Sequence, residues 1–97
     1  MKLGIEIKEE AREEIATTYM YYEFTQHGLG EKFLAAFEVA ANSIILNPKG
    51  YEKKYKALRY KLINPFPYII IFEIELTRIV VYQVINAKKH PSKRFRK

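Results

Sequence analysis

The spacing of apolar residues changes along the chain, and each spacing predicts a different element. Leu3, Ile5 and Ile7 alternate with other residues, which predicts a short, half-buried strand. From position 8 onward, apolar residues recur every three or four positions, the spacing of one helical face. These residues are Ala11, Ile15, Tyr19 and Tyr22. The chain is therefore expected to begin with a strand followed by a helix.

A second helix is predicted after a pair of glycines. Gly28 and Gly30 stand so close together that they mark a tight connection. The apolar stripe that follows has helical spacing and comprises Phe33, Phe37, Ala40 and Ile44. Asn47-Pro48 is expected to end this helix, because the residue before a proline is disfavoured in helical conformation. Two helices joined by so short a link predict an antiparallel hairpin.

The second half of the chain has the pattern of strands. Residues 49–56 (KGYEKKYK) are polar and without periodicity, which predicts a loop. Alternation over 58–62, and β-branched or aromatic residues over 67–75 and 78–85, predict three strands, the second apolar on both faces. The expected fold is α+β: an N-terminal strand and an antiparallel two-helix hairpin packed on a small antiparallel sheet. We expect one domain over residues 1–97.

The formal net charge of +6 is unevenly distributed. Residues 1–48 carry a net charge of −4, and residues 49–97 carry +10. A basic C-terminal tail, at about 88–97, holds six Lys or Arg residues, while the first 87 residues are neutral overall. Basic runs often serve solubility, but such a surface also attracts nucleic acid, ribosomes or an acidic protein. We expect the tail to be a partner surface.

The amino-acid composition excludes several kinds of chemistry. The chain has no cysteine, which excludes disulfides, thiolate catalysis and Cys-based zinc sites. His27 is expected to be structural, and His90 lies among lysines without a nearby carboxylate, so we expect no metal and no cofactor. No segment resembles a signal peptide, and no apolar run is long enough to span a bilayer. A cytoplasmic protein without membrane contact is therefore expected.

The order of these elements, together with several local patterns, resembles the RelE/ParE superfamily, the toxins of type II toxin–antitoxin pairs. Tyr21-Tyr22 followed by residues 28–33 (GLGEKF) resembles the "YY…GLG-x-x-F" stretch of plasmid-stabilisation proteins in the ParE-like branch. The ending from Asn86 to Pro91 resembles that branch's "H-x-x-R-x-P". Further matches are Asn47-Pro48, Arg59 and Phe66-Pro67-Tyr68. The resemblance covers nearly the whole chain.

This resemblance implies a small basic toxin that a co-expressed antitoxin neutralises within a hetero-oligomer. Antitoxins of this class present extended or helical segments that wrap the toxin. ParE-like members poison DNA gyrase, whereas RelE-like members cut messenger RNA on the ribosome. A third alternative is a degenerate member that binds partners without being toxic. One fold supports all of these functions, so the fold alone cannot choose among them.

RNA cleavage requires a base, an acid and cations that stabilise the phosphate. The resemblance suggests Arg59 and Lys61, on one strand face, and Lys89 and His90 after the last strand, as candidate catalytic residues. The chain departs from the family where a catalytic histidine or arginine is expected. The residues found there are Asn86, Lys89 and Ile69.

Tyrosines alternate with cations over residues 51–61, a pattern typical of nucleic-acid surfaces. The alternative is structural, with Tyr60 packed in the core together with Leu58 and Leu62. Candidate contacts to nucleic acid or another target are the cations of this segment and of the tail. They are Lys53, Lys54, Lys88, Lys93, Arg94 and Arg96.

Overall fold

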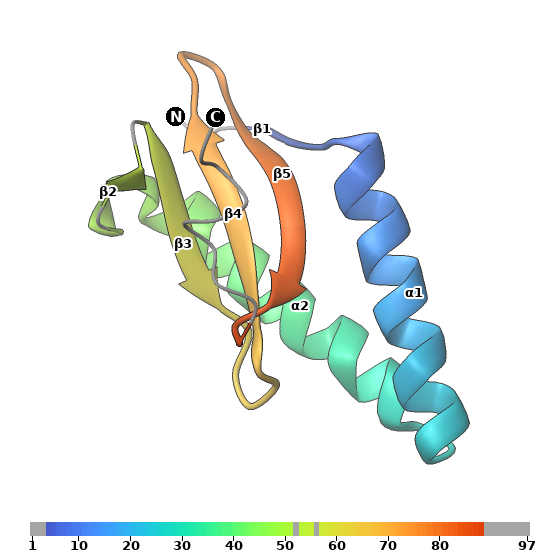
Figure 1. Ribbon diagram of the computed structural model, residues 1–97. Coiled ribbons are helices and arrows are strands. Elements are labelled where there is room, and N and C mark those ends of the chain that lie inside the picture. The colour runs from blue at the N-terminus through green and yellow to red at the C-terminus, as the bar shows by residue number, and fades with distance from the viewer. Residues whose placement is uncertain (1–3, 52, 56, 89–97) are drawn as a thin grey trace.

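A computed structural model describes residues 4–51, 53–55 and 57–88 (Figure 1). Its elements are β1 (Gly4–Ile7), α1 (Glu9–Thr25), α2 (Leu29–Leu46), the 3-10 turn η1 (Pro48–Gly50), β2 (Lys53–Tyr55), β3 (Leu58–Leu62), β4 (Tyr68–Ile74) and β5 (Arg78–Asn86). The strands form one sheet in the order β1-β5-β4-β3-β2. Helix α2 crosses one face of this sheet, and α1 lies beside β5 (Figure 1). The predicted α+β class is confirmed.

Two details differ from the sequence expectations. Strand β1 pairs with β5 in parallel, so the sheet is mixed rather than wholly antiparallel. No short hairpin connects these two strands, so the pattern of the chain does not set their relative direction. Within residues 49–56, predicted to be a loop, the structure has part of η1 and the strand β2, which pairs with β3. A strand of three residues at the sheet edge is too short to produce an apolar alternation.

The core lies mainly between the helices and the sheet. All four residues of the predicted α2 stripe are buried there, together with Ile70 and Phe72 of β4. A smaller cluster on the opposite face is formed by Ile69, Ile71 and Ile85, with Leu58 and Tyr60 packed against it. Strand β4 is therefore apolar on both faces, as predicted. Each fully buried side chain contributes about 1.5–3 kcal/mol through removal of apolar surface from water.

A carboxylate closes the turn between the two helices. Glu23, on α1, accepts hydrogen bonds from the backbone N–H groups of Gly28 (2.9 Å) and Gly30 (3.0 Å). These bonds satisfy donors at the start of α2 that have no partner within the helix. The bond from Gly28 is the main reason that the pKa of Glu23 lies below its usual value. Gly28 has a φ of 87°, a conformation that glycine adopts at low cost.

Gly30 allows α1 and α2 to come into close contact. A Cβ atom at this position would lie 2.7 Å from the carbonyl oxygen of Tyr19 and 2.8 Å from Cδ1 of the Tyr19 ring. The carbonyl oxygen belongs to the backbone of α1, so it can move away only if the helices separate.

We predict that Gly30→Ala lowers the free energy of unfolding by about 1–3 kcal/mol, because the added methyl group overpacks the helix contact. Urea denaturation of the purified protein measures this loss. Gly4→Ala is the matched control, since no atom lies within 4 Å of a Cβ at that site. Equal stability of the two variants would show that the helices can separate at little cost.

Candidate functional site

The candidate catalytic residues on β3 face the helical side of the sheet. Arg59 is paired with Phe72 and Lys61 with Ile70, so both side chains share the face of the main core. Arg59 Nη1 donates to the carbonyl oxygen of Tyr51, and the Lys61 ammonium lies 5.3 Å from the centroid of the Tyr51 ring. The shared face is as predicted, but both cations are engaged with Tyr51.

Tyr51 connects the segment that follows α2 to the core of the sheet. Its ring packs edge-on against Phe72, with 5.9 Å between the ring centroids. Arg59 thus ties the segment that follows α2 to the sheet, and its Nε atom is buried without a hydrogen-bond partner. Tyr60 packs beside Leu58 against the smaller apolar cluster on the opposite face, as the structural alternative expected, whereas Leu62 is 44% exposed. Tyr60 points to that face because side chains alternate along a strand.

The other candidate residues lie at or beyond the limits of the described chain. Lys89, His90, Lys93, Arg94 and Arg96 fall outside the described residues. Lys53 and Lys54 belong to β2, but the placement of their side chains is not described.

Asn86 and Ile69, which stand where the family carries catalytic groups, make contacts that stabilise the fold. Lys88 is exposed, and its backbone N–H donates to Asn86 Oδ1 at 2.8 Å. Asn86 therefore closes the turn that ends β5. Ile69 is 8% exposed and belongs to the smaller apolar cluster.

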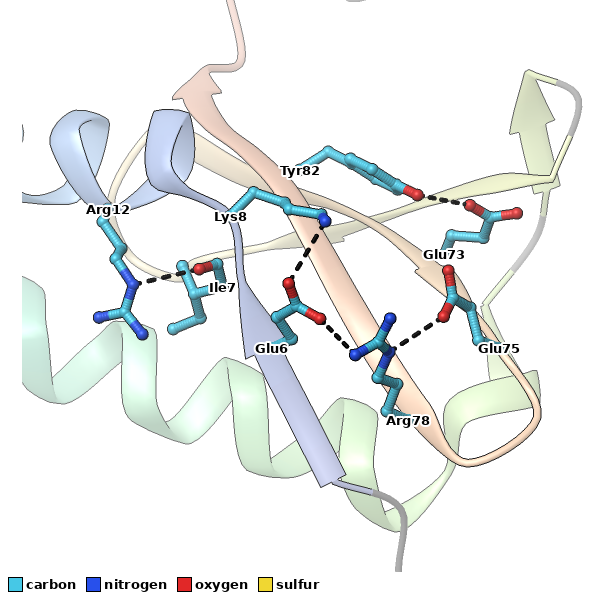
Figure 2. Close-up of polar contacts among 8 residues, drawn as sticks. All are labelled: Glu6, Ile7, Lys8, Arg12, Glu73, Glu75, Arg78 and Tyr82. Carbon is cyan, nitrogen blue, oxygen red and sulfur yellow. Dashed lines mark hydrogen bonds and ion pairs between the residues drawn. The ribbon is translucent and has the colours of Figure 1, made fainter.

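A polar network occupies the sheet face that points away from the helices (Figure 2). Arg78 lies between two carboxylates, 2.6 Å from Glu6 and 3.0 Å from Glu75. Tyr82 donates a 2.8 Å hydrogen bond to Glu73. The sequence analysis missed this network, although Glu73 and Glu75 interrupt an otherwise apolar strand. Among the described β3, β4 and β5 residues pointing to this face, Arg78 is the one cation.

Tyr82 keeps its proton well above neutral pH. Its hydrogen bond to Glu73, together with partial burial, raises the pKa of the phenol to about 12. The hydroxyl can donate a hydrogen bond at neutral pH but cannot act as a base there. This network therefore holds β1, β4 and β5 together.

An apolar groove runs along α2 on the side of β1. It consists of two adjoining hollows of about 310 and 300 Å³, which share Ile7, Phe37 and Glu38. We call it the α2–β1 groove. The first hollow extends toward α1, and the second toward the end of α2. The apolar residues that complete its walls are Ile5, Ile15, Ala16, Leu34, Ala41 and Ile45.

Sequence analysis missed this groove because it treated the helix faces as core. A signal was present in α2, where Ala41 and Ile45 widen the predicted stripe by one position on one side. A stripe broader than the sheet can cover leaves apolar residues at the surface. Polar groups line the groove as well, since Arg12 and Glu38 belong to its walls.

The groove lies next to a partly open strand edge. The N–H groups of Gly4 and Lys8 donate to Thr77 and Val81, so the peptide groups of Ile5 and Ile7 point away from the sheet. Arg12 Nε donates to the carbonyl oxygen of Ile7 at 3.1 Å (Figure 2). Arg12 thus covers the end of the edge near α1 and leaves the Ile5 end accessible for pairing.

The part of the chain that the structure describes holds neither a metal site nor a membrane-spanning helix. Within residues 4–51, 53–55 and 57–88, no group of three His, Asp or Glu side chains is arranged to hold a metal ion. Over the same residues, no helix is both long and apolar enough to cross a membrane.

Comparison with known proteins supports the fold. No protein-family model and no curated protein matches the chain. Among solved structures, it is similar to a chain of the "Chromosomal ParDE TA system from P. aeruginosa", with a TM-score of 0.67 and 13% sequence identity. The match covers 88% of this chain and 96% of that chain. This similarity confirms the fold expected from the sequence, which is that of a chain of a ParDE toxin–antitoxin system.

We predict that Tyr82 makes stability depend on pH in the alkaline range. The raised pKa means that its hydrogen bond to Glu73 stabilises the fold fully below pH 10 and is lost as pH rises through 10 toward 12. Tyr82→Phe should lower the free energy of unfolding by about 1–2 kcal/mol at pH 7. Urea denaturation from pH 7 to 11.5 should show this difference shrinking. A constant difference would mean that the hydrogen bond is not its source.

Proposed function

We propose that this chain is the ParE-like toxin of a type II toxin–antitoxin pair, acting in the cytoplasm, and that its antitoxin binds the α2–β1 groove. The fold match to a chain of a ParDE system supports the class. The observation that carries the proposal is the combination of an apolar groove with an accessible strand edge. A monomer that functioned alone would gain nothing from leaving both exposed.

The groove fits a helical or extended protein segment better than a small ligand. Its two hollows are continuous along α2, so a binding segment would contact several successive turns of that helix. Ala41 and Ile45 can receive apolar side chains at helical spacing. Arg12 and Glu38 carry opposite charges and can fix the direction of the bound segment.

The accessible end of β1 offers a second contact to the same partner. The peptide groups of Ile5 point outward, and a strand added there would continue the mixed sheet. Apolar contacts in the groove and backbone hydrogen bonds at the edge together account for tight, specific binding by one segment.

For the target, we propose DNA gyrase in preference to messenger RNA. In the described part of the sheet face away from the helices, Arg78 is held between Glu6 and Glu75. Arg59 and Lys61 lie on the other face and contact Tyr51. These three cations are therefore engaged in contacts within the fold, which makes them less suited to stabilising a phosphate.

We predict that Ala41→Glu weakens antitoxin binding by about a hundredfold, because it places a carboxylate in an apolar interface. The antitoxin is taken from the gene adjoining that of this chain, and binding is measured by calorimetry. Val39→Glu is the matched control on the same helix, since Val39 is 67% exposed and does not line the groove.

Circular dichroism must first show that both variants are folded. If Ala41→Glu binds the antitoxin as tightly as Val39→Glu does, the groove is not the docking site. If no protein encoded beside this chain binds it and its expression alone does not slow growth, the toxin proposal itself is wrong.

A separate prediction concerns the target. After tightly controlled induction without antitoxin, DNA synthesis should fall within minutes while amino-acid incorporation continues, as expected if gyrase is poisoned. Labelled thymidine and labelled amino acids, measured in parallel, give the order of the two effects. A fall in amino-acid incorporation that precedes the loss of DNA synthesis would favour the RelE-like alternative. Growth arrest with neither effect would exclude both targets.

A further inference from the structure

Strand β1 forms one edge of the sheet, and the outward backbone groups of this edge lie at Ile5 and Ile7. An open edge beside an apolar groove can pair with any strand that reaches it, including β1 of a second copy of the chain. Such a pair would also bring two α2–β1 grooves together and bury Ile5, which is 37% exposed. Self-pairing is therefore favoured unless a group at the edge opposes it.

Symmetry fixes the hydrogen bonds that such a pair would need. Two copies related by a twofold axis place their β1 strands antiparallel, because the axis reverses the strand direction. In the register that uses all the outward groups of β1, Ile5 of each copy exchanges both backbone hydrogen bonds with Ile7 of the other. The Ile7 carbonyl oxygens accept half of these bonds. A register centred on Ile5 would form only half as many within β1, and one centred on Ile7 would use the same carbonyl oxygens.

Arg12 occupies the acceptor on which this pairing depends. Its Nε atom donates to the carbonyl oxygen of Ile7 at 3.1 Å (Figure 2). Because β1 ends at Ile7 and α1 begins at Glu9, the first turn of the helix holds the guanidinium close to the end of the strand. A second β1 strand could reach the Ile7 carbonyl only after both copies had moved Arg12. Each copy would then exchange a hydrogen bond from a charged donor for a weaker one from a neutral amide.

Glu6 is a weaker obstacle to self-pairing than Arg12. In the same register, Glu6 faces Glu6 of the other copy, and like charges directly opposite each other destabilise a strand pair. However, the Glu6 carboxylate already lies 3.3 Å from the Lys8 ammonium and 2.6 Å from Arg78 Nη1 (Figure 2). These two cations balance its charge, so the repulsion between the copies would be small. Arg12 is therefore the group that opposes self-pairing most strongly.

We propose that Arg12 prevents the β1 edge from pairing with a second copy of this chain and so leaves the edge open to strands of other proteins. The register of a strand from a different protein is not set by symmetry. Such a strand can exchange hydrogen bonds with Ile5, whose peptide groups point away from the sheet, and leave the bond between Arg12 and Ile7 in place. This inference concerns the chain alone and does not depend on the toxin proposal.

Sedimentation equilibrium of the full chain tests this inference. The wild-type chain should be monomeric, and Arg12→Ala should dimerise with a dissociation constant at least about tenfold below that of the wild type. Lys32→Ala is the matched control and should stay monomeric, since it removes an exposed cation of α2 that does not line the groove. Circular dichroism must show that each variant is folded. Arg12→Met, which keeps an apolar stem and removes the donor, replaces Arg12→Ala if that variant does not fold.

A second substitution tests whether β1 itself forms the dimer. Ile5→Pro removes the outward N–H of Ile5, and proline is tolerated where the N–H of an edge strand faces solvent. Adding Ile5→Pro to Arg12→Ala should restore the monomer. A folded Arg12→Ala chain that stays monomeric would overturn the proposal, as would a wild-type dimer that Ile5→Pro separates. Dimers of Arg12→Ala that persist with Ile5→Pro would also overturn it, because they would form at another surface. Antitoxin binding, measured separately on Ala41→Glu, reports on the toxin proposal and not on this inference.

Discussion

The turn between the two helices fixes the position of the α2–β1 groove. The Glu23 carboxylate holds the backbone at Gly28 and Gly30, and the missing side chain at Gly30 lets α2 touch the backbone of α1. These contacts determine the direction in which α1 leaves α2. Helix α2 is anchored on the sheet through buried residues such as Phe33 and Ile44. The direction of α1 therefore sets the width of the space on each of its sides.

The two sides of α1 have different chemistry because they face different neighbours. On the side of α2 and β1, Ile15 and Ala16 line an apolar groove. On the side of β5, Glu10 and Glu14 bind the part of the strand edge that β1 leaves unpaired. These carboxylates accept hydrogen bonds at an edge where a neighbouring strand would otherwise lie, and they hinder strand addition there. On this side of the sheet, the edge that these carboxylates leave uncovered is that of β1.

Much of the fold could be predicted from local patterns, and the rest depends on contacts between distant residues. The α2 stripe and the strand apolar on both faces were correct because burial imposes spacing directly. The parallel pairing of β1 joins opposite ends of the chain, and no local pattern encodes it. Strand β2 was missed because a strand of three residues, two lysines and a tyrosine, is too short to show periodicity. For the candidate site, the alternation along β3 placed Arg59 and Lys61 on one face of the strand. It could not show that this face is the one that contacts Tyr51.

The basic second half is less available to partners than its charge of +10 suggests. Arg59 and Lys61 contact Tyr51, and Arg78 is held by two carboxylates, so these cations serve the fold. Six of the basic residues lie in residues 88–97, after the last strand. Binding in the apolar α2–β1 groove depends on buried area and should respond weakly to salt, whereas contacts of the basic C-terminal tail are screened within about 10 Å at 0.1 M salt. The two kinds of contact would therefore differ in their response to salt.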